Sequence, residues 1–186
     1  MKAVLASHNL NKLRELAAGF PGSELELLEG VRFPPEVGET YYENARAKAE
    51  VGHEARPESW VLGEDSGLEV EGLGGAPGIR SARYAPEGAE AVTKLLAELR
   101  GVEGDGRRAR YLCELVALSP DGGEHRGTGI LEGRIASEAR GSEGFGYDPV
   151  FVPNGEEQTV AELGNEWKAE HSHRARAASA LRSALG

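Results

Sequence analysis

The order of apolar patterns along the chain constrains its fold more than any other feature. The first half alternates short apolar runs, such as KAVLAS at residues 2–7, with segments whose apolar residues recur at helical spacing. The second half carries three strand-like runs in succession, at residues 108–120, 124–136 and 147–153. Strands that first alternate with helices and then follow one another predict an α/β fold with a central mixed, twisted sheet flanked by helices. We expect a single domain over residues 1–186, with no second independent core.

Helices are predicted where apolar residues repeat at i, i+3 and i+4 or where alanine is frequent. These segments are residues 12–20, 41–55, 92–99 and 172–185. Further strands are predicted at residues 24–28 and at residues 59–65, SWVLGED, where a buried strand ends on two adjacent acids. Adjacent carboxylates repel each other, so we expect them to share a cation or a proton.

The charge balance excludes several classes of partner. The chain of 186 residues has 21 basic and 31 acidic side chains, a net charge of -10, which is unlike a protein that tracks a nucleic-acid backbone.

No apolar run approaches the roughly 20 residues needed to span a bilayer, and the first apolar run is too short for a secretory signal. The one cysteine, Cys113, lies in an apolar run and is expected to be buried in a reducing compartment. We therefore expect a cytoplasmic protein with no nucleic-acid or membrane partner.

The segment SHNLNK, residues 7–12, lies where the first strand gives way to the first helix. Unpaired backbone N–H groups at a helix start, together with Ser7, Asn9 and Lys12, would suit a phosphate group. The alternative is that Asn9 or Asn11 only caps the helix while Lys12 is solvated. No GxxxxGK[ST] motif is present, so the P-loop architecture is excluded.

Three carboxylates, Glu36, Glu64 and Asp65, form a second group, on two predicted loops. Mg²⁺ prefers a few carboxylates, several waters and substrate phosphates, and one of these acids could accept a proton from an attacking water. The alternative is that the acid pair is an ordinary solvated turn in a chain rich in acids.

Glycines surround the remaining polar groups. Residues 72–85 form a glycine-rich loop with Arg80 and Arg83, which could reach anions or pair with surface acids. In GSEGFGYDPVF, residues 141–151, an aromatic face and Asp148 could stack a planar base and accept its N–H groups. The alternative is an irregular strand entry with Phe145 in the core, and for Tyr147 this alternative is favoured.

The last polar cluster begins the final helix. Ser172 is a plausible N-cap, which would leave His173 and Arg174 free to donate hydrogen bonds to a carbonyl oxygen on a base. His171 and His173 could be metal ligands, but a zinc site is disfavoured because the chain offers them no partner cysteine and the other candidate ligands are carboxylates.

Five motifs in this order resemble the inosine triphosphate pyrophosphatase (Ham1-like) family. They are SHNLNK, PEVGETYYENA, EDSGLEVEGLGGAPGIRSARYA, GFGYDPVF and SHR, and together they span nearly the whole chain. The resemblance implies Mg²⁺-dependent hydrolysis of the unusual purine nucleoside triphosphates dITP, ITP and XTP to the monophosphate and pyrophosphate. It also implies a homodimer with an elongated mixed sheet.

The resemblance assigns roles to particular residues. Asp65, Lys12 and Lys48 are implied as catalytic residues. Glu36, Glu64 and Asp65 are implied as metal ligands. The implied substrate contacts are Ser7, His8, Asn9, Leu10, Asn11, Lys12, Ser66, Phe145, Gly146, Tyr147, Asp148, Lys168, His173 and Arg174.

Two positions depart from the family pattern, because many bacterial relatives have Asp where this chain has Glu64 and Gly where it has His8. Three alternatives also remain: a nucleotide-binding regulatory module without catalysis, a phosphatase that removes the terminal phosphate, and a glycoside hydrolase with paired acids. The glycoside hydrolase is disfavoured, because adjacent residues in an extended chain point to opposite faces.

Overall fold

The computed structural model describes residues 2–86 and 88–186. Its centre is a six-stranded sheet in the order β2-β1-β3-β4-β5-β6. The sheet is mixed, because β1 pairs in parallel with β2 and with β3, whereas β5 and β6 are antiparallel. The predicted α/β fold with a mixed sheet is therefore confirmed.

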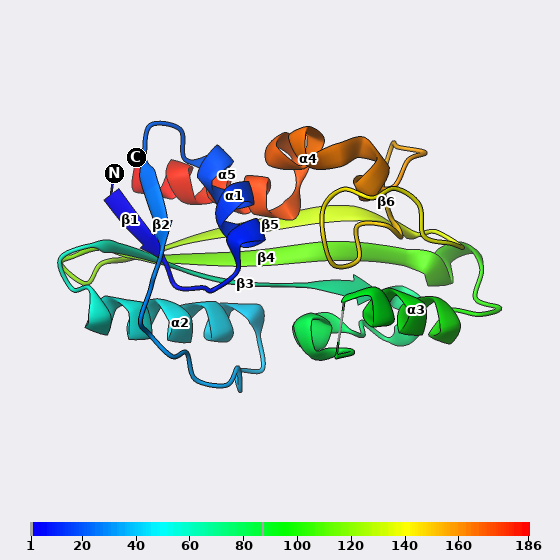
Figure 1. The fold of residues 1–186 in the computed structure, drawn as a ribbon, viewed down its shortest axis with the longest axis horizontal. Coiled ribbons are helices and arrows are strands. Elements are labelled where there is room, and N and C mark those ends of the chain that lie inside the picture. The colour runs from blue at the N-terminus through cyan, green and yellow to red at the C-terminus, as the bar shows by residue number, and fades with distance from the viewer. Residues whose placement is uncertain (1, 87) are drawn as a thin grey trace. The chain divides into compact units, whose positions relative to one another are not determined.

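The strands and α-helices have these bounds: β1 (Lys2–Leu5), α1 (Leu10–Gly19), β2 (Glu24–Leu27), α2 (Tyr41–Ala55), β3 (Trp60–Val70), α3 (Gly88–Glu98), β4 (Arg108–Leu118), β5 (Glu124–Ile135), β6 (Phe151–Pro153), α4 (Val160–His171) and α5 (His173–Leu185) (Figure 1). Short 3₁₀ turns occupy Glu71–Leu73, Gly78–Arg83 and Gly104–Arg107. No helix in the described part of the chain is long and apolar enough to span a membrane.

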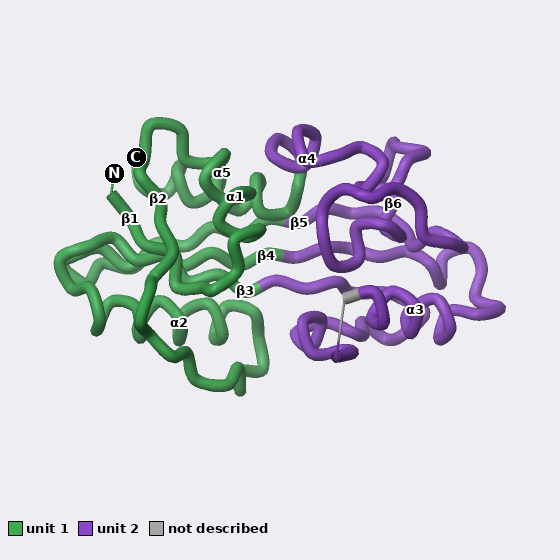
Figure 2. The backbone as a smooth tube through the Cα atoms, viewed as in Figure 1, with its two compact units in different colours: residues 1–65, 113–129, 172–186 green, residues 66–112, 130–171 purple. Residues whose placement is uncertain are grey.

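Backbone contacts divide the chain into two compact units (Figure 2). Unit 1 comprises residues 1–65, 113–129 and 172–186, and unit 2 comprises residues 66–112 and 130–171. We describe each unit by itself, and a single domain over residues 1–186 stays a prediction.

Unit 1 has helices on both faces of its strands (Figure 1). On one face, α1 and α5 bury Leu16 and Leu181 against Leu62 and Leu115. On the other face, the alanines of α2 pack against alternate residues of β4, among them Val116. Successive residues of a strand point to opposite faces, so each central strand contributes to both layers.

Glycines in the strands allow these helices to lie close to the sheet. A methyl group at Gly63 would overlap the Ala45 carbonyl oxygen of α2. A methyl group at Gly129 would overlap the His173 carbonyl oxygen at the start of α5. Glycine in a strand often marks such a close approach, and the two helices involved carry Lys48 and Arg174.

Unit 2 has its own apolar core. Leu95 of α3 and Leu99, directly after that helix, pack with Leu68, Leu131 and Phe151 of the strands. The helix α4, which the sequence pattern did not predict, contains a break at Gly164, where φ is 89° and ψ is 177°. That break interrupts the helical spacing of apolar residues, which is why the pattern was weak.

The largest correction concerns β3. The strand was expected to end at the acid pair, but it continues to Val70, so Glu64 and Asp65 lie in the middle of a strand and not on a loop. Leu68 and Val70 are buried and maintain the strand beyond Gly67. The last predicted strand is shorter than expected, since β6 spans only Phe151–Pro153.

Candidate active site

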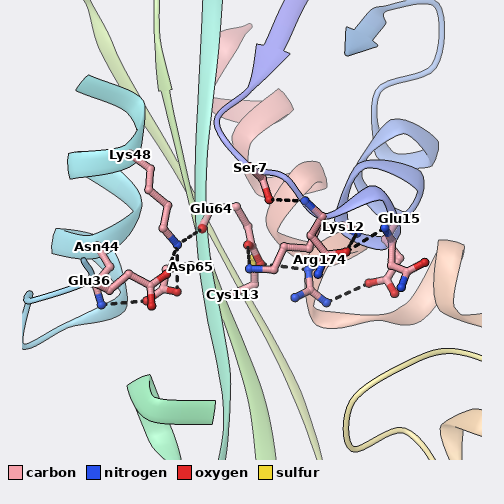
Figure 3. A network of polar contacts seen from close by, with 12 residues as sticks. Ser7, Lys12, Glu15, Glu36, Asn44, Lys48, Glu64, Asp65, Cys113 and Arg174 are labelled. Atoms are coloured by element: carbon pink, nitrogen blue, oxygen red, sulfur yellow. Dashed lines mark hydrogen bonds and ion pairs between the residues drawn. The ribbon is translucent and has the colours of Figure 1, made fainter. Parts of the chain in front are cut away.

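The two acids of β3 lie on opposite sides of the strand (Figure 3). Asp65 faces α2, and Glu64 faces α1 and α5. This follows from the two-residue period of an extended chain. The two carboxylates therefore have different side-chain partners, and the expectation that they share a cation or a proton stays a prediction.

On the Asp65 side, α2 supplies two polar side chains. The Asn44 amide donates to Asp65 Oδ2 at 3.0 Å. The Lys48 ammonium lies 3.4 Å from Asp65 Oδ1 and donates to the Glu64 backbone carbonyl at 3.0 Å. Lys48 also forms a close ion pair with Glu36. One ammonium group is thus surrounded by two carboxylates and a carbonyl oxygen.

Burial and neighbouring charges together shift the pKa values of Asp65 and Lys48. Burial raises the pKa of Asp65, and the nearby Glu36 and Glu64 carboxylates add to that rise, while Lys48 only partly opposes it. For Lys48, burial alone would lower the pKa, but Asp65, Glu64 and Glu36 outweigh burial and raise it. Lys48 is therefore charged at neutral pH, whereas the ionised form of Asp65 is incompletely stabilised.

On the Glu64 side, two cations hold one buried carboxylate. Lys12 Nζ lies 2.6 Å from Glu64 Oε2, and Arg174 Nε donates to Glu64 Oε1 at 3.0 Å. Arg174 Nη1 also donates to Glu15 Oε2 at 3.0 Å. Burial would raise the pKa of Glu64, but Lys12 and Arg174 hold it well below the ordinary range. Lys12 is therefore not merely solvated, and Arg174 donates to two carboxylates, while a substrate contact by Arg174 stays a prediction.

The loop before α1 has the geometry of a capped helix start. Asn9 Oδ1 accepts from the backbone N–H groups of Asn11 and Lys12, at 2.9 and 3.3 Å. Ser7 Oγ accepts from the Asn9 backbone N–H at 3.1 Å, and Leu10 is exposed. Of the two candidate caps, Asn9 is the one observed. A phosphate contact by residues 7–12 stays a prediction.

The start of α5 confirms the predicted N-cap. Ser172 Oγ accepts from the Ala175 backbone N–H at 3.2 Å. His173 and Arg174 follow directly and are both buried. Cys113 is also buried, as expected, and its thiol lies 3.7 Å from Glu64 Oε1.

A second polar group, in unit 2, surrounds Asp148. Its carboxylate accepts hydrogen bonds from Lys168 Nζ and from the Phe145 backbone N–H, each at 2.7 Å. The Tyr111 hydroxyl also donates to this carboxylate, at 3.3 Å. The Lys168 ammonium lies over the half-buried Phe145 ring, 4.3 Å from its centre. Both charged groups are buried. A cation beside an aromatic ring and a carboxylate is an arrangement that can hold a planar polar ligand.

Three other predicted contacts in unit 2, Tyr147, Gly146 and Ser66, differ in their exposure. Tyr147 is buried and donates to the Ser81 carbonyl at 2.9 Å, which agrees with the structural alternative favoured for it. Gly146 is exposed, with φ of 63°. Ser66 is half-buried in β3.

The site's donor set fits a hard divalent cation on one side of β3 only. No three acidic, histidine or cysteine side chains in the described residues are placed together to hold a metal ion, so Glu36, Glu64 and Asp65 do not form one cluster. The oxygens of Asp65, Glu36 and the Glu64 carbonyl do converge on the Lys48 ammonium. Mg²⁺ uses few protein carboxylates and completes its shell with water and phosphate, so this set fits.

Two residues of the site escaped the sequence analysis. Glu15 is three residues after Lys12 on α1, and that spacing places both on one helix face. Asn44 is a buried polar residue inside α2, where asparagine is unfavourable unless it has a hydrogen-bond partner. Both signals were available in the sequence.

The fold and the site together define an α/β protein whose acids and lysines are suited to a phosphorylated substrate. The chain belongs to the Ham1 family, whose profile matches residues 3–184.

Relatives in sequence and a relative with a solved structure agree with this assignment. The dITP/XTP pyrophosphatase of Bacillus subtilis is 40% identical over 99% of this chain and 96% of its own. The dITP/XTP pyrophosphatase of Bdellovibrio bacteriovorus is 47% identical over 79% of this chain and 75% of its own. A HAM1 protein structure from Coxiella burnetii has a TM-score of 0.87 at 34% identity, covering 100% of this chain and 98% of its own.

Proposed function

We propose that this protein hydrolyses dITP, ITP and XTP to the nucleoside monophosphate and pyrophosphate, and that it requires Mg²⁺. The observation that most supports the Mg²⁺ requirement is the convergence of three oxygens on the Lys48 ammonium. They belong to the Asp65 carboxylate, the Glu36 carboxylate and the Glu64 backbone carbonyl. Relatives that match nearly the whole chain are dITP/XTP pyrophosphatases, which supports the same reaction.

The residues of unit 1 have separate roles in this proposal. A bound Mg²⁺ would be held by Asp65 and Glu36 and would polarise phosphoryl oxygens while neutralising their charge. Asp65 also orients the attacking water and accepts its proton. Lys48 and Lys12 offset negative charge on the triphosphate, and residues 7–12, at the positive end of the α1 dipole, are its proposed binding loop.

Base selection is assigned to the buried polar side chains. Asp148, Lys168 and Phe145 form one candidate base site, and His173 and Arg174 are further candidates. Donors that meet the six-position oxygen of hypoxanthine or xanthine would face the amino group of adenine. Each donor left unpaired costs about 1–3 kcal/mol, so adenine is disfavoured by roughly ten- to a hundredfold per contact.

Assembly and location are also part of the proposal. We infer a cytoplasmic homodimer from the family resemblance. Light scattering coupled to size-exclusion chromatography tests the dimer, and a single monomeric peak across the working concentration range would refute it.

The decisive experiment identifies products. The protein is incubated with dITP, ITP, XTP, dATP and dGTP, with Mg²⁺ or with EDTA, and pyrophosphate and orthophosphate are measured separately. We expect pyrophosphate from dITP, ITP and XTP, little turnover of dATP, and no turnover in EDTA. Orthophosphate as the first product would support a terminal phosphatase, and binding without product would support a regulatory module. Reaction in H₂¹⁸O shows which phosphorus is attacked.

A further inference from the structure

Residues 29–40, called segment 29–40 below, join β2 to α2 and form no helix or strand. The segment carries Glu36, next to Val37, whose side chain is 88% exposed. Asp65, in contrast, lies on a central strand of the sheet. One carboxylate of the proposed metal site is therefore on a regular element and the other is on an irregular one, so Glu36 has to be kept in place by specific contacts.

The end of segment 29–40 is fixed by α2. The Gly38 backbone N–H donates to Asn44 Oδ1 at 2.9 Å. Thr40 and Glu43 form a reciprocal capping box at the start of the helix. These contacts follow Glu36 in the chain, so the part of the segment before Glu36 depends on other contacts.

His8 supplies contacts on that other side. Its Nε2 lies 3.0 Å from the Val31 carbonyl oxygen. A carbonyl oxygen only accepts, so Nε2 carries the proton and donates. The His8 ring also meets the Phe33 ring, with centroids 5.0 Å apart and planes tilted by 49°. Val31 and Phe33 themselves pack against the small core cluster of Val4, Ala6, Leu28 and Val61.

His8 thus joins the loop of residues 7–12 to segment 29–40. We propose that His8 is a positioning residue that holds segment 29–40 so that Glu36 stays beside Asp65 before a divalent cation binds. The inference rests on the proposed function, because the cation is the one required for pyrophosphate release. It assigns to the His8 ring a role other than direct contact with the substrate, since both of its contacts are to the segment.

Three variants separate the two contacts. His8→Ala removes both of them. His8→Gln keeps an amide donor at about the reach of Nε2 but loses the ring, and His8→Phe keeps a ring but loses the donor. His125→Ala is the matched control, because His125 is a second histidine of unit 1 whose ring meets Trp60 instead.

The first measurement is the Mg²⁺ concentration that gives half the maximal rate of pyrophosphate release from dITP. We expect about a threefold to tenfold increase in His8→Ala, the range for losing one hydrogen bond and one ring contact near the surface. The glutamine and phenylalanine variants should fall between it and the wild type. The Mg²⁺ requirement and kcat are measured separately, because a role in holding Glu36 for the cation shifts the Mg²⁺ requirement.

The second measurement needs no turnover. Deuterium exchange of the amides of residues 31–38 is compared in metal-free wild type, His8→Ala and His125→Ala. We expect faster exchange only in His8→Ala, with the difference diminished by Mg²⁺. An unchanged Mg²⁺ requirement, whether or not kcat falls, would overturn the proposal. If the wild type releases no pyrophosphate from any triphosphate, the proposed function fails, and the exchange comparison alone then decides the role of His8.

Discussion

The two sides of β3 in unit 1 carry the same kinds of side chain but differ in how well their charges are matched. On the Glu64 side, two cations bind one carboxylate, and its pKa is lowered well below the ordinary range. On the Asp65 side, two carboxylates converge on one ammonium, and the pKa of Asp65 is raised. Both acids are buried and adjacent in sequence.

This difference separates a carboxylate that is suited to stabilising the fold from one that is suited to binding a metal ion or a proton. A carboxylate whose pKa is lowered in the fold is already stabilised in its charged form, and a further cation adds little. A buried carboxylate whose pKa is raised gains stabilisation when a metal ion arrives, and it can also take up a proton. The Asp65 side is therefore where we place the cation and the water activation, and the Glu64 side is a scaffold that positions Lys12 and Arg174.

The largest expected effect comes from removing the charge of Asp65. Asp65→Asn keeps the shape of the side chain but removes the proposed metal ligand and proton acceptor, so kcat should fall by at least about a thousandfold. The measurement is pyrophosphate release from dITP at saturating Mg²⁺. Substrate binding, measured by calorimetry with Ca²⁺ in place of Mg²⁺, should persist within about tenfold. Full activity in this variant would remove Asp65 from the chemistry.

A change on the other side of the strand should affect stability first. Glu64→Gln leaves Lys12 and Arg174 with a neutral partner in a buried site, which should cost about 3–5 kcal/mol in the free energy of unfolding. Urea titration measures this loss. Glu50→Gln is the control, because Glu50 forms an exposed pair with Arg46 that should contribute less than about 1 kcal/mol. If both variants were equally stable, the Glu64 side would not be a scaffold.

The smallest expected effect is a gain in stability with a defined pH dependence. The folded-state pKa of Asp65 is raised above its unfolded value, so its ionised form destabilises the metal-free fold at neutral pH. That destabilisation is relieved as the pH falls through the raised pKa. Asp65→Asn in EDTA should therefore be more stable than wild type at pH 7, by less than the loss in Glu64→Gln, and the gain should disappear near pH 3. Denaturant titrations at several pH values would detect an opposite sign.

Much of the fold was predictable from periodicity alone. The helix at residues 41–55 and the successive strands β4 and β5 appeared where apolar and alanine patterns placed them. The caps Asn9 and Ser172 were also predictable, because their side chains precede helical repeats. The end of β3 was not, since Gly67 resembles a terminator and only burial of Leu68 and Val70 keeps the strand going.

The candidate site was predictable as a set of residue types but not as a set of pairs. The sequence indicated Glu64, Asp65, Lys12 and Lys48, yet their pairing depends on which helix lies on which face of the sheet. That choice is made by contacts far apart in the chain, such as Arg174 with Glu64. Local spacing contains no information about such contacts, so Arg174 was expected to be free.

Gly63 lets α2 approach the Asp65 side of β3 more closely than any other residue would. Since the backbone of α2 rests directly on the backbone of β3 at this residue, no side chain lies between them that could change rotamer and absorb a displacement. The spacing between the backbones that carry Lys48 and Asp65 is consequently set by close main-chain approach and not by a layer of large apolar side chains. Substitutions elsewhere in the core of unit 1 are therefore expected to change its stability more than the spacing of these two backbones.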